Sequence, residues 1–383
     1  MASTSLVEKR AIGLTELQAL IELLAAREYR IIGPVLRDGA IVYDDVKRTA
    51  DLPAGWTDRQ EAGHYNVERR DDAALFGYAV GPSSWKRFLH PPLEVLWRAR
   101  RENGSLAVTP TQPPAQKLAF LGVRACELSA VAIQDRVFMD GPYLDTLYAH
   151  RRRDAFIVAV NCADPANTCF CTSMGTGPKA EAGFDLALTE LVGTTWHGFV
   201  VEVGSGAGAE VLAQLSTRAA SAEEVAAAEA VSVLAAQRIT RRLDTQGLKE
   251  ALQAAAVHPH WDDVAARCLG CANCTMVCPT CFCTSVADHS DLAGEEAERV
   301  RRWDSCFNTD FSFIHGGPVR AGRAARYRQW ITHKLASWID QFGTSGCVGC
   351  GRCIAWCPVG IDIIQEADAI RTGAPGEGHH GGA

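Results

Sequence analysis

Two copies of one cysteine pattern constrain this chain more than any other feature of its sequence. Each copy has the spacing C-x2-C-x2-C-x3-C and is followed directly by a proline, Pro279 or Pro358. Each cysteine of the second copy lies 79 residues after its counterpart, so the pattern is an internal repeat. The first repeat contains Cys268, Cys271, Cys274 and Cys278, and the second contains Cys347, Cys350, Cys353 and Cys357.

This spacing is suited to iron–sulfur clusters. Three thiolates two residues apart can surround one [4Fe-4S] cubane, whereas the fourth cysteine reaches the other cubane, as in two-cluster ferredoxins. Structural zinc also uses C-x2-C pairs, but a longer loop separates its two pairs, so clusters are the favoured interpretation. The pattern predicts crossed ligation, with one cluster on Cys268, Cys271, Cys274 and Cys357 and a second on Cys347, Cys350, Cys353 and Cys278.

Composition and charge narrow the range of partners. The chain has fifteen cysteines, and its first residues lack the apolar core of a secretion signal, which favours metal ligation in a reducing cytoplasm over disulfides. No apolar run reaches the length of a membrane span. The net charge of -7 gives no reason to expect nucleic acid. We therefore expect a cytoplasmic protein with neither a membrane nor a nucleic-acid partner.

The first hundred residues carry ordinary signals of helices and turns. Thr15 and Gln18 are predicted to form a capping box ahead of an amphipathic helix. A hairpin is expected around residues 38–39, where Asp is followed by Gly. Residues 92–101 have helical patterning, and the proline-rich stretch 108–115 is interpreted as a surface connection.

Two predicted buried strands, at 117–123 and 155–160, place thiols at one sheet edge. Cys126 follows the first strand and Cys162 the second, and the carboxyl ends of sheet strands are the usual place for ligands in an α/β fold. The alternative is that these are buried core cysteines, but two of the four thiols lie in a Gly/Ser/Thr-rich loop. We therefore expect a third cluster bound by Cys126, Cys162, Cys169 and Cys171.

Three cysteines remain, namely Cys281, Cys283 and Cys306. They could support a fourth site with a ligand other than cysteine. They could also lie in the second coordination shell of the repeat clusters and adjust their potentials. Because four thiols are the usual requirement of a cluster, the second interpretation is favoured.

The glycine-rich segment 204–209 fits the dinucleotide-binding pattern G-x-G-x-x-G/A. That pattern also requires a strand ending in an acidic residue about twenty residues later. Glu223 and Glu224 lie at this distance but open a stretch with helical patterning, roughly 222–243. A plain strand-to-helix turn is the favoured interpretation, and the chain is expected to bind no dinucleotide.

The expected fold class is α+β, with an α/β domain over 1–235, a mainly helical ferredoxin-like domain with two clusters over 236–371, and a disordered tail over 372–383.

Arginines are frequent from Arg299 to Lys334. A solvated basic face is the default interpretation of such a run. Docking of an acidic partner, or compensation of the negative charge of all-cysteine clusters, is the functional alternative.

Several segments resemble a known family. The series GVRACEL, NCADPANTCFCTSMGTGP, CPTCFCTSV, HGGPVR and FGTSGCVGCGRCIAWCPVGID resembles the β (iron–sulfur) subunit of cytoplasmic sulfhydrogenases, the bidirectional NAD(P)-linked [NiFe] hydrogenases. It is also similar to the A subunit of anaerobic sulfite reductase. The resemblance covers residues from about 117 to 366. It implies cluster ligation at both repeats and at the four N-terminal thiols.

The same resemblance implies a function for the whole chain. It implies an electron-transfer subunit that relays electrons through [4Fe-4S] clusters between an FAD/NAD(P)-binding subunit and the small and large subunits of a [NiFe] hydrogenase. The alternative within the resemblance is the electron-transfer subunit of a sulfite reductase-type, NAD(P)H-dependent reductase. A cluster enzyme with an open iron would need a three-thiol site, and a nucleic-acid-binding scaffold would conflict with the acidic net charge.

Overall fold

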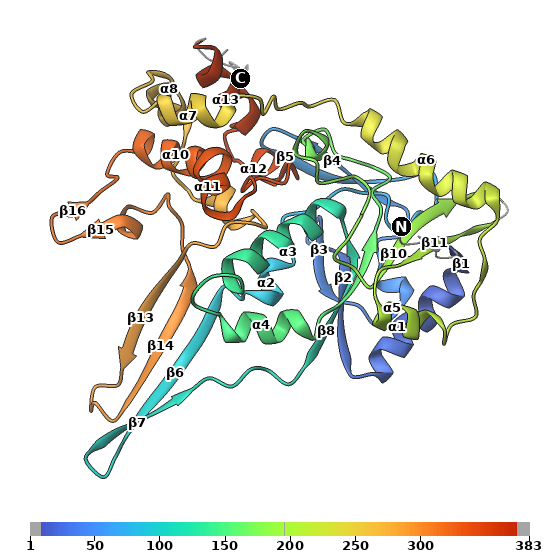
Figure 1. Ribbon diagram of the computed structural model, residues 1–383, viewed down its shortest axis with the longest axis horizontal. Helices are drawn as coiled ribbons and strands as arrows, with labels where there is room; N and C mark the ends of the chain where they lie inside the picture. The colour runs from blue at the N-terminus through green and yellow to red at the C-terminus, as the bar shows by residue number, and fades with distance from the viewer. Residues whose placement is uncertain (1–8, 195, 374–383) are drawn as a thin grey trace, which may run out of the picture.

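The computed structural model describes residues 9–194 and 196–373 (Figure 1). The N-terminal part is built on a mixed sheet made of β1 (Arg10–Gly13), β2 (Tyr29–Arg37), β3 (Ala40–Asp45), β8 (Lys117–Val123), β9 (Phe156–Val160), β10 (Leu186–Val192), β11 (His197–Val203) and β12 (Arg218–Ala219). Among the described residues its order is β12-β1-β11-β10-β9-β8-β2-β3. Strands β2, β8, β9 and β10 are parallel neighbours, so their carboxyl ends meet at one edge.

Helices cover both faces of this sheet. Helices α1 (Leu14–Ala26) and α5 (Gly206–Leu212) pack on the face that carries Leu121, whereas α3 (Ala125–Phe138) and α4 (Thr146–Arg153) pack on the face that carries Phe120. Successive side chains of β8 point to opposite faces, and both faces are buried. The sheet therefore forms the central layer of three.

Several N-terminal predictions are confirmed. The hairpin at residues 38–39 joins β2 to β3, and the strands at β8 and β9 and the helix after Arg124 are present. The first helix is also present, but the expected capping box is wrong. The helix begins two residues earlier, with Gly13 as its N-cap, and the backbone N–H of Gly13 donates to Glu16 Oε2 at 2.9 Å.

A second sheet projects from the body of the molecule and is called the arm below (Figure 1). It consists of β6 (Leu93–Glu102), β7 (Ser105–Pro110), β13 (Thr284–Ser290) and β14 (Glu296–Trp303), in the order β13-β14-β6-β7. The helix predicted over 92–101 is therefore wrong, because this segment pairs as a strand with β7, just after it in the chain, and with β14, about two hundred residues later. The predicted connection over 108–115 is wrong at its start, which belongs to β7.

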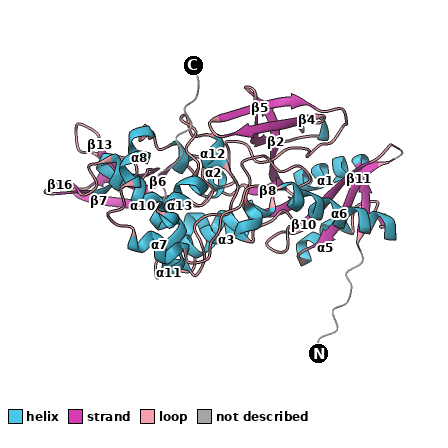
Figure 2. Cartoon of the chain, turned by 90° about the horizontal axis from the view of Figure 1, so that it is seen from above, coloured by secondary structure: helices cyan, strands magenta, loops and turns pink. Residues whose placement is uncertain are grey.

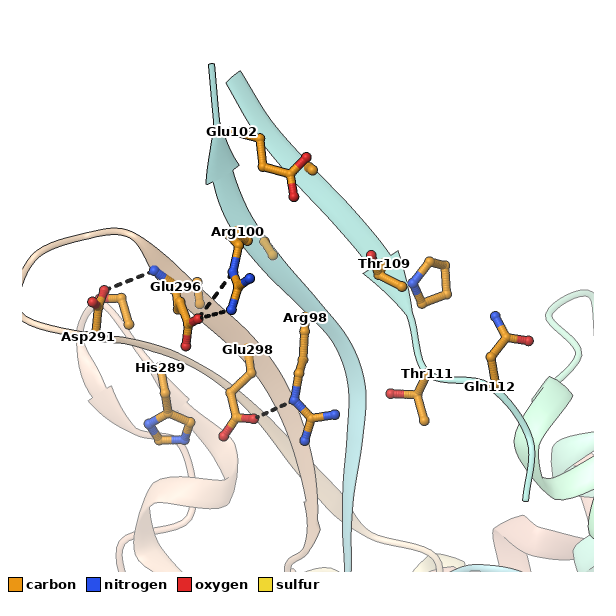
Figure 3. A pocket seen from close by; sticks show the side chains of 15 residues that line it. Arg98, Arg100, Glu102, Thr109, Thr111, Gln112, His289, Asp291, Glu296 and Glu298 are labelled. Carbon is orange, nitrogen blue, oxygen red and sulfur yellow. Dashed lines mark hydrogen bonds and ion pairs between the residues drawn. The ribbon is translucent and has the colours of Figure 1, made fainter. Parts of the chain in front are cut away.

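One face of the arm carries a charged hollow (Figure 3). Arg98 pairs with Glu298 at 3.5 Å, and Arg100 pairs with Glu296 at 2.6 Å. Its lining residues include no cysteine. The hollow is therefore separate from the sites discussed below.

Short helices form the C-terminal part, at the opposite end of the molecule from α1 and α5 (Figure 2). They are α7 (Leu248–Ala254), α8 (His260–Arg267), α9 (Asn273–Met276), α10 (Arg323–Thr332), α11 (Trp338–Phe342), α12 (Arg352–Ala355) and α13 (Ile363–Thr372). Trp261, Tyr327 and Trp330 lie in their shared core. Helices α9 and α12 occupy equivalent places in the two cysteine repeats.

The two parts are joined in several places. The arm takes two strands from each part, and the hairpin of β4 (Trp56–Glu61) and β5 (His64–Arg69) donates from Gly63 N–H to Ile354 O at 3.1 Å. The boundary at 235–236 stays a prediction. Of the predicted disordered tail, Thr372 ends α13 and residues 374–383 lie outside the described residues.

The glycine-rich segment 204–209 is a strand-to-helix turn, as predicted. Ser205 caps α5 by accepting from Gly208 N–H at 3.0 Å. Glu223 and Glu224 lie in the first turn of α6 (Ala222–Arg238), which ends before the expected residue 243. No helix in the described part of the chain is long and apolar enough to cross a membrane.

Candidate metal centres

The two cysteine repeats have the same local backbone. Gly270 and Gly349 adopt positive φ values of 67° and 64°. The N–H of Gly270 donates to Cys268 Sγ at 3.3 Å, and the N–H of Gly349 donates to Cys347 Sγ at 3.4 Å. Backbone donors of this kind stabilise a thiolate and influence the potential of a cluster that it binds.

The first three thiols of the first repeat meet a thiol of the second. Cys268, Cys271 and Cys274 line one cavity together with Cys357, and Cys353 of the second set borders the same cavity. Cys268 directly follows α8, and Cys274 lies in α9. Phe307, Tyr327 and Trp330 complete the apolar wall. The fold thus brings together the set that the spacing predicts for the first cluster.

The second set is assembled in the same way, with the roles of the two repeats exchanged. Burial raises the pKa of the Cys353 thiol well above its usual range, and the nearby thiols of Cys347, Cys350 and Cys278 raise it further. Cys278 of the first repeat therefore lies among the first three cysteines of the second. Lys334 Nζ donates to Cys278 Sγ at 3.3 Å and supplies a positive charge beside this set.

The N-terminal thiols meet at the edge where parallel strands end. Cys126 lies in the first turn of α3, after β8, and Cys162 follows β9. Cys169 and Cys171 come from the loop beyond, and all four line one cavity. Burial raises the pKa of Cys171 to about 12, with Cys162 and Cys350 as the next largest causes. The set predicted for the third cluster is therefore brought together as well.

The second repeat forms part of the wall of this N-terminal cavity. Gly349 and Cys350 line it, and Cys169 Sγ lies 4.0 Å from Cys350 O. A Cβ atom on Gly349 would come within 2.6 Å of the backbone of Phe170 and Cys171, so only glycine fits this approach. Cys350 therefore belongs to the second repeat set and also borders the third.

The donor chemistry fits [4Fe-4S] clusters. Burial and neighbouring thiols raise the pKa of Cys126, Cys169 and Cys274 well above the usual range, so these thiols ionise readily only beside a bound cation. No group of three or more His, Cys, Asp or Glu in the described part of the chain is placed to hold one metal ion. A cubane instead binds each of its four cysteines at a different iron.

Buried charges around the thiols were missed by the sequence reasoning. Arg124 donates to Phe76 O at 2.7 Å and Tyr78 O at 2.8 Å, and its burial is nearly complete. Arg352 forms a fully buried ion pair with Glu127. Arg124 lies two residues before Cys126, and Arg352 lies directly before Cys353. This closeness to cysteines in the sequence could have indicated their role. Neighbouring charges of this kind influence the potential of a cluster.

The arginine-rich segment is not simply a solvated basic face. Arg301 is largely buried and pairs with Glu94 and Asp145. Arg323 donates to Cys268 O at 2.9 Å, beside the first thiol set. Several of its arginines are therefore used inside the molecule.

The remaining thiols lie outside these three sets. Cys281 lies close to Cys278, and Cys283 lies close to Cys306. Cys283 and Cys306 line an open pocket that also contains Arg320 and His333.

Two comparisons with known proteins give matches. A 4Fe-4S dicluster domain matches residues 267–361, which include both repeats. Sulfhydrogenase 2 subunit beta of Pyrococcus furiosus is 35% identical over 260 residues, which cover 67% of this chain and 75% of that protein. The chain belongs to the sulfhydrogenase β-type family of iron–sulfur subunits. As such it is an iron–sulfur electron-transfer subunit with [4Fe-4S] clusters. No solved structure gives a significant match.

Proposed function

We propose that this chain relays electrons through three [4Fe-4S] clusters within a cytoplasmic hydrogenase complex. Its partners would be an FAD/NAD(P)-binding subunit and the small and large subunits of a [NiFe] hydrogenase. The proposed ligands are the two crossed repeat sets and the four N-terminal thiols. The similarity to a sulfhydrogenase subunit supports a hydrogenase over a sulfite reductase-type partner.

The position of Cys350 is the main observation that supports this proposal. It lies among the thiols of the second repeat set and lines the N-terminal cavity, so these two sites share a wall. Cys274 and Cys353 lie close together and link the first set to the second. The three sites therefore form a continuous series across the joint between the two parts of the chain.

The protein supplies position and charge to this series. When bound, [4Fe-4S] clusters accept and release single electrons. Lys334 and Arg124 place positive charge beside the second and third thiol sets. Cys271 and Leu269 are exposed at the first set, which would bring that end of the series close to a docked partner. The chain therefore provides a path, and the partners would provide the chemistry at either end.

Reconstitution with purified partners tests the relay. Dithionite should reduce the isolated subunit, which should oxidise neither hydrogen nor NAD(P)H. In the complete complex, Cys350→Ala should strongly depress NAD(P)H-linked hydrogen oxidation. Hydrogen oxidation by a dye that accepts electrons at the hydrogenase module should be retained. Substantial NAD(P)H turnover by the isolated subunit would reject the proposal.

A further inference from the structure

Three thiols lie outside the proposed relay sites, with Cys283 and Cys306 in one pocket and Cys281 nearby, beside Cys278. Cys281 and Cys283 follow the first repeat, and Cys306 follows β14. Cys283 and Cys306 line the same pocket, and the N–H of Asp304 donates to Cys283 O at 2.8 Å. Cys283 and Cys306 open onto a pocket whose lining includes no cysteine of the repeats.

Two buried lysines reach the same place. Lys86 is 5% exposed and Lys334 is 3% exposed. Lys86 Nζ donates to Cys281 O at 3.0 Å and lies 3.9 Å from the ring centre of Trp303. Lys334 Nζ donates to Cys278 Sγ and, at 3.0 Å, to Thr280 Oγ1.

No carboxylate in the described part of the chain balances these two ammonium groups, since the ion pairs found there include neither lysine. Burying a charge without a counter-charge is costly. Lys334 also has a thiol of the second repeat set beside it, whereas Lys86 contacts the backbone of Cys281 itself. Negative charge at the three remaining thiols would therefore offset the charge of these two lysines.

The backbone next to these thiols is irregular. A π-helical turn, His333–Ser337, is inserted between α10 and α11. π-Bulges within helices are rare and occur frequently at functional sites. This turn directs Lys334 towards Cys278, while His333 lines the pocket that contains Cys283 and Cys306.

We propose that Cys281, Cys283 and Cys306 bind a fourth iron–sulfur cluster. It would be a [4Fe-4S] cubane with thiolates on three irons, and its fourth iron would face the open pocket lined by Arg320, His333 and Gln341. The negative charge of a thiolate-bound cluster would offset Lys86 and Lys334. This site extends the proposed relay, but its test depends on iron at these three thiols and not on the relay.

Iron and acid-labile sulfide counts on the full-length chain, purified and reconstituted without oxygen, test the site. The unsubstituted chain should bind about sixteen irons, whereas Cys283→Ser and Cys306→Ser should each bind about twelve. Thr284→Ala is the matched control, because Thr284 lines the same pocket without a thiol. It should retain the full count. Unchanged counts in both folded cysteine variants would overturn the proposal and favour a second-shell role.

A measurement on the unsubstituted chain covers the case in which the variants do not fold. An iron with three sulfides and no protein ligand can bind cyanide, whereas a cluster with four thiolates cannot do so without losing one. Cyanide should therefore alter the EPR signal of one reduced cluster and leave the others unchanged. A count of about twelve irons with no cyanide-sensitive signal would reject the site. Failure of the relay would look different, because the irons would be present while turnover was lost.

Discussion

The repeat region and the N-terminal cavity hold their thiols in different ways. In the repeats, eight cysteines come from two short segments that exchange their fourth members, Cys278 and Cys357. In the N-terminal cavity, the four thiols come from a helix start, a strand end and a loop, and the second repeat closes the wall. The first arrangement is set by local spacing, whereas the second depends on the fold of the whole sheet.

This difference predicts how the loss of a cysteine should affect the clusters at each site. Because the repeats exchange cysteines, damage at one repeat should appear at the cluster of the other. None of the four thiols proposed for the N-terminal cluster comes from the repeats, although Cys350 lines the same cavity, so loss of that cluster should leave both repeat clusters in place. Substitutions at Gly349 or Cys350, which lie in the wall that the two sites share, should instead affect both sites.

The largest expected effect is the loss of a repeat cluster at a distance in sequence. Cys357→Ala should damage the cluster bound by Cys268, Cys271 and Cys274, because Cys357 lines their cavity. Iron counting should show a loss of up to about four irons. EPR of the reduced protein should lose the signal that Cys268→Ala also removes. If the lost signal is instead the one removed by Cys347→Ala, the crossed assignment is wrong.

The next prediction concerns the N-terminal cavity. Cys169→Ala should remove about four irons and leave both repeat signals unchanged, because this thiol lines the N-terminal cavity and belongs to neither proposed repeat set. Thr172→Ala, in the neighbouring turn of the loop, is the control without loss of a thiol. Full retention of iron by the Cys169 variant, with an unchanged spectrum, would remove the third cluster from the proposed relay.

The same contrast explains what the sequence could reveal. The repeats are visible because cluster ligation needs fixed local spacing, and the ends of β8 and β9 are visible because parallel strands align their carboxyl ends. The segment at β6 was predicted as a helix because one of its two strand partners, β14, is distant in the chain, and the other, β7, runs into the stretch interpreted as a proline-rich connection. Lys86 and Lys334 carry no local signal, since their burial arises only when α2 (Lys86–Leu89) and the π-helical turn pack around the loop at Cys281.

A smaller effect is expected at the charge pair that joins the two regions. Arg352 of the second repeat pairs with Glu127 of α3, and Glu127 Oε2 also accepts from Tyr43 at 2.7 Å and Trp85 at 3.0 Å. Arg352→Met should lower the free energy of unfolding by about 3–5 kcal/mol, because it leaves a buried carboxylate without its cation. Denaturant titration measures this loss.

Two further variants sharpen the test of this pair. Glu127→Leu combined with Arg352→Met should recover much of the stability, because the uncompensated charge is gone. Arg100→Met, which removes an exposed pair on the arm, should cause no measurable loss. Equal effects of the Arg352 and Arg100 substitutions would show that the buried pair does not hold the two regions together.

The smallest expected effect is a pH dependence at the joint between α2 and the arm. His90 is buried, its ring packs against Phe138, and its carbonyl accepts from Trp303 Nε1 at 3.0 Å. Burial, together with the nearby charges of Arg301 and Lys86, lowers the pKa of His90 to about 3. The unfolded chain, with a histidine pKa of about 6.5, therefore binds a proton between about pH 6.5 and pH 3 that the folded chain does not.

Stability should consequently fall as the pH falls through this window, by at most about 1.4 kcal/mol per pH unit from this one group. His90→Phe keeps an aromatic ring at the joint and removes the titrating group. Between about pH 6.5 and pH 5.5 the unsubstituted chain should lose about 1 kcal/mol more than the variant in denaturant titrations. Carboxylates common to both proteins cancel in this difference. Parallel pH profiles would show that the joint opens enough to hydrate His90, and that the arm is held to the body by its strand pairing rather than by a dry contact at this ring.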